Sequence, residues 1–242
     1  MGDNVMVRGN ALLTVLPSPA VTVIRPRVVR VLRCESIGHL DLASRFRRLV
    51  YDVSGDADAS TVLLCDHPPS ITIGRHGSIA DIRLRPDQLA RMDLHYIARG
   101  GGTIPHGSGQ IGCYPVLPLA AWGITPGEYV ARLLRTTARL CRSFDIDAEC
   151  DGETACVMVE GRVIATAGVA VRSGVCTYGI VLNATPDLDD FAAVRFGNKA
   201  MTSLNRESIM RVRLSDVRRR MFEAVATEFD LDADVAAPSS QD

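Results

Sequence analysis

Lysine is nearly absent from this sequence. Its 242 residues include 27 basic side chains, and Lys199 is the only lysine among them; all the others are arginine. A composition that has drifted so far toward arginine makes its one remaining lysine a residue of interest. Acidic and basic residues almost balance and leave a net charge of −1. This balance predicts no general attraction to nucleic acid or to an anionic membrane.

Two further absences bear on where the protein acts. No apolar run approaches the ~20 residues of a membrane-spanning helix, and the first residues lack the basic-then-apolar pattern of a secretory signal. The seven cysteines are odd in number and show no C-x-x-C spacing. They are expected to be reduced thiols, most of them small core residues. Together these features predict a cytoplasmic protein, and no metal site or cofactor is expected.

The segment from Arg99 to Gln110 is unusually rich in glycine, with five glycines, one arginine and one histidine in twelve residues. Glycine permits positive φ and lets a ligand approach backbone N–H groups. Arginine supplies charge, and histidine can carry a proton. The segment lies between two strand-like runs, Leu94–Ile97 and Ile111–Leu117, which favours a ligand-binding loop over a flexible surface turn. His106 stands between proline and glycine and is expected to lie outside the core.

Hydrophobic spacing predicts an α+β domain with an antiparallel-rich sheet. A helix is predicted over Ser36–Val53. A second helix is predicted from Thr125, which opens a capping box, to about Phe144. A third is predicted over Ser215–Phe229, with Ser215 as its N-cap. Strands are predicted at Thr61–Cys65, Ile71–Ile73, Cys156–Val159, Val163–Val171 and Val175–Asn183. The chain is interpreted as an extension (residues 1–27), a domain (28–230) and a disordered tail (231–242).

Four motifs in this chain resemble those of the octanoyl–acyl carrier protein:protein octanoyltransferases. Residues 63–75 are similar to the family's Leu-Leu-Glu-His-Pro-Pro…Leu-Gly-Arg motif. Residues 99–110 are similar to its Arg-Gly-Gly…His-Gly-Pro-Gly-Gln motif. Its Gly-Arg-Lys-Ile-Ala and Gly-Leu-Ala-Leu-Asn motifs are similar to residues 161–165 and 179–183. The resemblance extends from about residue 28 to about residue 230. It implies a single domain of the biotin and lipoate protein ligase type, with a mixed, antiparallel-rich sheet packed with helices.

The resemblance also implies which residues line a substrate pocket between the glycine-rich segment and the strand Val175–Asn183. Small residues at these positions leave space for an acyl chain, although tight strand packing explains them almost as well. The candidate substrate-binding residues are Arg99, Gly100, Gly101, Gly102, Thr103, Ile104, Pro105, His106, Thr166, Ala167, Gly168, Gly179, Ile180 and Val181.

The sequence departs from the family at its two catalytic positions. The resemblance implies an acyl-accepting cysteine and a lysine that lowers the pKa of this cysteine and contacts the acyl carbonyl. The lysine corresponds to Val163, which is expected to face the pocket, and the cysteine is expected at Gly197. Valine cannot donate a hydrogen bond and glycine cannot form a thioester. Cys176 is the leading candidate for a relocated nucleophile, ahead of Cys113 and Cys156. Lys199 is a candidate for the lost lysine's role, with a plain surface lysine as the alternative.

Three functions remain open at this point. The first is the transfer of an octanoyl or lipoyl group from acyl carrier protein to lipoyl-domain proteins, with altered or lost catalysis. The second is a catalytically inactive module of the same fold that binds the acyl group or its carrier. The third is an ATP-dependent lipoate or biotin protein ligase, which needs no cysteine but also relies on a lysine near Val163.

Overall fold

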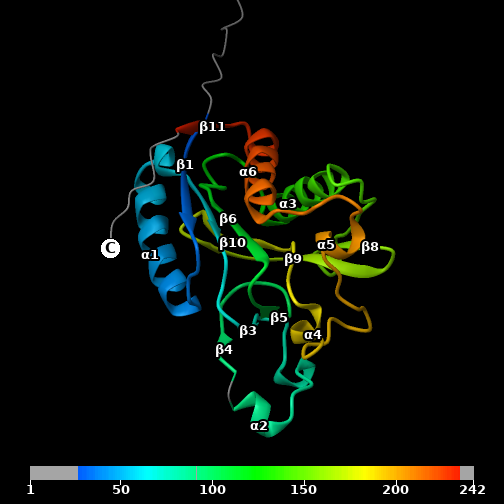
Figure 1. Cartoon of the computed structure of the whole chain (residues 1–242). Coiled ribbons are helices and arrows are strands. Elements are labelled where there is room, and N and C mark those ends of the chain that lie inside the picture. Colours follow the sequence, from blue (N-terminus) through cyan, green and yellow to red (C-terminus); the bar gives the residue numbers. More distant parts are fainter. Residues whose placement is uncertain (1–26, 91, 235–242) are drawn as a thin grey trace, which may run out of the picture.

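The computed structural model describes residues 27–90 and 92–234, and it is built around an eight-stranded mixed sheet (Figure 1). The strand order is β11-β1-β2-β6-β10-β9-β8-β7. Most neighbouring strands are antiparallel, while β1 pairs in parallel with β2 and with β11. The strands are β1 (Arg27–Cys34), β2 (Thr61–Cys65), β6 (Gln110–Val116), β7 (Glu149–Asp151), β8 (Cys156–Val159), β9 (Arg162–Arg172), β10 (Val175–Asn183) and β11 (Leu231–Asp234).

Helices cover both faces of this sheet (Figure 1). The helix α1 (His39–Gly55) packs on one face, and α3 (Pro126–Arg142) and α6 (Leu214–Phe229) pack on the other. The larger core lies between the sheet and the latter two helices and includes the aromatic pair Tyr129 and Phe229. The predicted α+β fold with a mixed, antiparallel-rich sheet is therefore confirmed.

The strongest helix prediction is confirmed at its start, where the Thr125 side chain accepts a hydrogen bond from the Glu128 backbone N–H. The predicted N-cap of the last helix is wrong. The Val217 N–H donates to the Arg213 carbonyl, so the first helical hydrogen bond begins two residues before Ser215 and Arg213 occupies the N-cap. Ser215 thus lies inside the first turn.

The end of the domain also differs from the prediction. Residues 231–234 were expected to belong to a disordered tail, but they form β11 in parallel register with β1, with Arg27 opposite Leu231. Asp230 ends α6 in the left-handed region (φ 53°) and turns the chain toward that edge. Residues 1–26 and 235–242, which hold most of the predicted extension and tail, lie outside the described residues.

A second, three-stranded sheet carries much of the glycine-rich segment. It has the order β4-β3-β5, from β3 (Ser70–Ile73), β4 (Leu94–Tyr96) and β5 (Thr103–His106). The segment is therefore only partly a loop, because Thr103–His106 pair antiparallel with Ser70–Ile73. Short helices α2 (Pro86–Leu89), α4 (Leu188–Phe191) and α5 (Leu204–Glu207) complete the fold, with 3₁₀ turns at Ala57–Ala59 and Ile79–Asp81.

Within the described part of the chain, none of the helices combines the length and the apolar character that crossing a bilayer requires.

Candidate functional site

Arg99 is a buried cation that contacts no carboxylate of the described residues. Its side chain is 3% exposed. One guanidinium nitrogen, Nη1, donates to the carbonyls of Gly100 and Gly102 at 2.9 and 3.1 Å, and Nη2 donates to Oγ1 and the carbonyl of Thr72 at 2.7 and 3.3 Å. Burial lowers the pKa of Arg99 to about 10, so the group still carries its charge at neutral pH. The guanidinium therefore ties the glycine-rich segment to β3.

Two glycine positions make this arrangement sterically possible. Gly101 has φ +80°, a left-handed conformation that residues with a Cβ rarely adopt. A Cβ on Gly168 of β9 would lie 2.7 Å from the Gly100 carbonyl oxygen. The Gly100 N–H donates to the Val169 carbonyl at 2.7 Å, so the loop lies directly on β9. These glycines bring two distant segments together around Arg99.

His106 lies inside the protein, contrary to the expectation of a loop histidine outside the core. It is 5% exposed because its strand, β5, is covered by α1 and by the large sheet. Its Nε2 lies 2.8 Å from Thr72 Oγ1, and its Nδ1 has no hydrogen-bond partner in the described structure. Burial, with smaller contributions from His67, His39 and Arg99, holds the pKa of His106 well below its usual value. The ring is therefore neutral at pH 7.

The hydrogen-bond network favours one position for the proton on this neutral ring. Arg99 Nη2 donates to Thr72 Oγ1, and that hydroxyl has its own proton to give. His106 Nε2, at 2.8 Å, is a much closer acceptor than the Ile104 carbonyl at 3.5 Å. Nε2 therefore accepts, and the ring proton lies on Nδ1. His106 thus holds a buried, unpartnered N–H donor.

Four histidine rings gather at this point. The ring of His39 lies 4.5 Å from that of His67, 4.6 Å from that of His106 and 5.3 Å from that of His95, between centroids. His67 Nδ1 donates to the Ile37 carbonyl at 2.7 Å, which leaves Nε2 to accept from the Tyr114 hydroxyl at 2.6 Å. Burial lowers the pKa of His67 and lowers that of His39 to about 3. These rings are neutral at pH 7 as well.

The glycine-rich segment and β10 face one another across a small cavity. The cavity measures about 10 Å³, room for a single water-sized group. Of the candidate substrate-binding residues, the structure brings Arg99, Ile104, His106, Thr166, Gly168, Gly179 and Val181 together around it. His39, Leu42, Ile97, Tyr114 and Tyr178 complete the lining.

Other candidates for substrate binding do not line this cavity. Ala167 and Ile180 belong to the larger core beneath α3, because alternate residues of a strand face opposite sides of the sheet. Thr103 Oγ1 donates to Asp81 at 2.8 Å, and the Pro105 carbonyl accepts from Gln110 at 3.2 Å. The carbonyls of Gly100, Gly101 and Gly102 are bound by Arg99 or by N–H groups of residues 74–76. These residues pack or form hydrogen bonds outside the cavity and support the residues that line it.

Sequence reasoning did not identify His39, Thr72, Tyr114 or Tyr178. His67 was visible within the Leu-Leu-Cys-Asp-His-Pro-Pro motif, but its role was not. The others come from separate elements, α1, β3, β6 and β10, and no local pattern marks them. Only the tertiary structure brings His39, Tyr114 and Tyr178 to the cavity and Thr72 to His106.

The two positions expected to hold family catalytic residues lie away from this cavity. Val163 is fully buried and lines neither the His106 cavity nor the surface groove described below. Its N–H donates to the Ala200 carbonyl and its carbonyl accepts from the Thr202 N–H. Gly197 is exposed, with φ +61° and open space around the position of a Cβ. A cysteine there would have room but would adopt a strained backbone.

Cys176 is not placed to act as a nucleophile. It is fully buried in the larger core, and burial raises the pKa of its thiol to about 12. Burial raises the pKa of Cys113 to about 12 and also raises that of Cys156. A thiol acts as a nucleophile through its thiolate, which these environments suppress. Burial in the larger core therefore argues against Cys176 and Cys113 as candidates for a relocated nucleophile.

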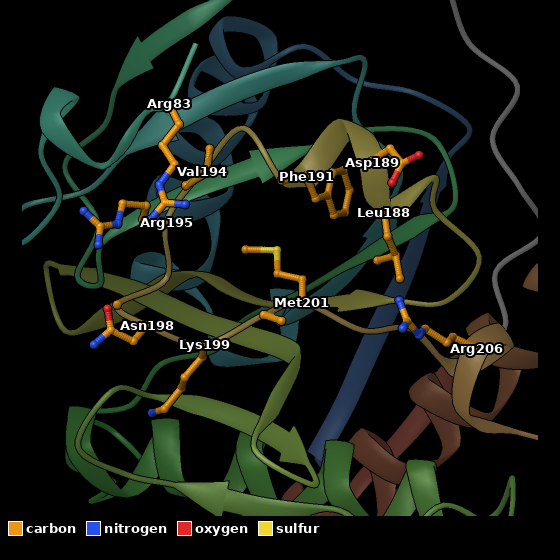
Figure 2. Close-up of a pocket in the computed structure, with 13 residues that line it drawn as sticks. Arg83, Leu188, Asp189, Phe191, Val194, Arg195, Asn198, Lys199, Met201 and Arg206 are labelled. Carbon is orange, nitrogen blue, oxygen red and sulfur yellow. The ribbon is translucent and has the colours of Figure 1, made fainter.

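Lys199 forms an ion pair. Its Nζ lies 2.8 Å from Asp151 Oδ2 on β7, and this hydrogen bond raises the pKa of the amine. In Figure 2 the side chain points away from Met201, which occupies the middle of the view. The structure thus gives Lys199 a partner on β7 and no contact with the His106 cavity.

A larger surface groove adjoins this region (Figure 2). It measures about 420 Å³ and follows the segment 188–201 that includes Gly197. Among the described residues, no cluster of histidine, cysteine or acidic side chains has the arrangement of a metal site.

Comparisons with known proteins place this chain in a family. Residues 45–228 match the lipoyl protein ligase A/B catalytic domain. The chain belongs to this family. It is 37% identical over 172 residues to an octanoyltransferase of Syntrophobacter fumaroxidans, covering 69% of this chain and 74% of the relative. It is 33% identical over 177 residues to an octanoyltransferase of Bacteroides thetaiotaomicron, covering 69% and 78%.

The solved structures agree with this assignment at the level of the fold. A lipoate-protein ligase A bound with ATP superposes with a TM-score of 0.65 at 15% identity, over 86% of this chain and 90% of the ligase. The expectation of a ligase- and transferase-type fold is therefore confirmed.

The neutral histidine cluster predicts acid sensitivity. Below about pH 6.5 the histidines of the unfolded chain take up protons that His39, His67 and His106 in the folded protein do not. The unfolded state then binds more protons, so the free energy of unfolding decreases as pH falls, by up to about 1.4 kcal/mol per pH unit for each histidine. Urea denaturation at pH 7.5 and 5.5 measures this loss. The exposed variant His76→Gln should leave it unchanged, and equal stability at the two pH values would contradict the neutral cluster.

The Thr72 hydroxyl is predicted to fix the His106 tautomer. At pH 7.5, ¹⁵N chemical shifts should show the His106 proton on Nδ1 in the native protein and in Thr72→Ser. Thr72→Val removes the hydroxyl and should give a mixture of tautomers, with a stability cost of about 1–3 kcal/mol for the unsatisfied guanidinium N–H. A native protein with its proton on Nε2 would refute the assigned network.

Proposed function

We propose that this protein handles octanoyl or lipoyl groups in protein lipoylation, receiving them from acyl carrier protein for lipoyl-domain proteins, without forming a thioester on its own cysteines. Family membership and the similarity to octanoyltransferases support the substrate class. The single observation that carries the proposal is the His106 cavity. It presents hydrogen-bond donors and a buried cation but no ionisable thiol.

The cavity is suited to a carbonyl oxygen. His106 Nδ1–H is an unpartnered donor, and the charged Arg99 lies behind it through the Thr72 hydroxyl. A fixed N–H donor beside a buried positive charge stabilises negative charge that develops on an acyl oxygen. The lysine that contacts the acyl carbonyl in the related transferases has no counterpart at Val163, and His106 supplies a donor in its place.

In this route the acceptor lysine attacks the carrier thioester directly. The new C–N bond forms as the C–S bond breaks, the amine loses one proton, and the carrier leaves as a thiolate that takes up a proton. The protein contributes by holding the carbonyl against His106 and by bringing the two substrates together. Neutral His39, whose Nδ1 is also unpartnered, lies 4.6 Å from His106 between ring centroids.

A second candidate, binding without turnover, is favoured by one specific observation. The position of the family lysine is a fully buried valine that is hydrogen-bonded through its backbone to residues 200 and 202. A protein of this kind binds the acyl group or its carrier and does not transfer the acyl group. The same experiment separates the two candidates.

Intact-mass spectrometry tests the proposal. After incubation with octanoyl–acyl carrier protein, the protein should gain no hydroxylamine-labile octanoyl mass, because no cysteine forms a thioester. With a lipoyl domain added, amide formation that survives each single Cys→Ser substitution supports direct transfer.

Carrier binding without amide formation supports the binding module instead. A labile octanoyl adduct that maps to one cysteine would overturn the proposal, as would pyrophosphate release from ATP and free octanoate.

A further inference from the structure

The surface groove beside α4 combines an apolar floor with a positively charged rim. Leu188, Phe191 and Met201 form the floor, and Arg83, Arg195 and Arg206 stand at its edges (Figure 2). The single acidic side chain in its lining is Asp189. The groove is therefore amphipathic, and its charged groups are predominantly positive.

Backbone pairing holds two of these arginines near one another. Ile82 and Val194 form an antiparallel bridge, in which the Arg83 N–H donates to the Ala193 carbonyl and the Arg195 N–H to the Asp81 carbonyl, each at 2.7 Å. Residues 83 and 195 are diagonal neighbours across this bridge, within reach for long side chains. In Figure 2 both side chains lie on the left of the view, with Arg83 running downward and Arg195 extending outward, away from Met201.

These cations have no partner among the described residues. Neither Arg83, Arg195 nor Arg206 donates a side-chain hydrogen bond or forms an ion pair. The carboxylate of the neighbouring Asp81 already accepts from Ser78 and Thr103. An anion that both side chains reach from these diagonal positions would reduce the repulsion between their like charges and would be stabilised.

The groove lies beside the turn that follows His106. Gly107 follows His106 directly, and a Cβ on Gly107 would lie 3.3 Å from the Phe191 ring. The floor of the groove therefore adjoins the turn that carries His106. Gly197, where the family's nucleophile was expected, lines the same groove.

We propose that this groove binds the phosphodiester-linked thiol arm of a carrier protein. Arg83 and Arg195 hold the phosphate through charge-assisted hydrogen bonds, and the arm lies over the apolar floor with its thioester directed toward His106. This inference rests on the proposed function, and it adds the recognition site for the arm.

Binding of carrier protein with and without its arm tests the inference. Isothermal titration should show that the arm-bearing carrier binds more tightly than the carrier from which the arm is missing. Arg83→Gln combined with Arg195→Gln should raise the Kd of the arm-bearing carrier about tenfold or more, and should leave the weak binding of the armless carrier unchanged.

The control is Arg45→Gln combined with Arg48→Gln. It removes the same two charges from the exposed surface of α1 and should change either Kd by less than about threefold, which is under half of the free-energy change of a tenfold step. Equal binding of the two carrier forms, or equal losses in the two double variants, would overturn the inference in favour of general attraction to an acidic protein.

Coenzyme A separates a failure of this inference from a failure of the proposed function, because it carries the same phosphate-linked arm without the carrier protein. If the native protein binds neither carrier form, the proposed function fails. Coenzyme A binding that is lost in Arg83→Gln with Arg195→Gln would still support the groove, and no binding of coenzyme A would overturn it.

Discussion

A buried guanidinium, which has no carboxylate partner in the part of the chain that the structure describes, organises this protein's site. Arg99 satisfies its N–H groups with backbone carbonyls of the glycine-rich segment and with Thr72, and in doing so joins that segment to β3. Its charge contributes to the lowered pKa of His39 and of His106. An ion pair at this position would cancel the charge within the protein. Carbonyl and hydroxyl acceptors instead leave a net positive charge next to the cavity.

The chemical groups of the chain are distributed so that the site offers donors and charge but no nucleophile. The thiols of Cys113 and Cys176 lie in the core, where burial favours their protonated form. Lys199 is held by Asp151. What remains around the cavity is a set of neutral rings, one of which holds an unpartnered N–H. This combination is able to orient and polarise an acyl group that another molecule carries.

The sequence predicts well those features that local pattern encodes. The Thr125 cap and the β-rich runs from residue 156 to 183 specify their elements through residues close together in the chain. The glycine-rich segment is visible because its conformations need glycine. The family resemblance adds the fold, and it adds the expectation that this segment lies opposite Gly179 across a pocket.

Features that depend on distant partners were not predictable in this way. His106 is flanked by proline and glycine, which is typical of a turn, and its burial arises from α1 and from the pairing of β5 with Ser70–Ile73. Cys176 was close to the expected site along the chain, but strand alternation directs it into the core. The four-ring histidine cluster unites residues from separate elements, and β11 becomes ordered through its pairing with β1.

The central claim is that Arg99 holds the glycine-rich segment against β3 and β9. Amide hydrogen exchange of Arg99→Met, which keeps much of the buried volume, tests it most directly. The N–H groups of Gly74 and His76 donate to carbonyls of this segment, and the Gly100 N–H donates from the segment to β9. The account predicts that these three amides exchange much faster in the variant, while amides of β6 and β10 stay protected. Unchanged protection at these three amides would contradict the account.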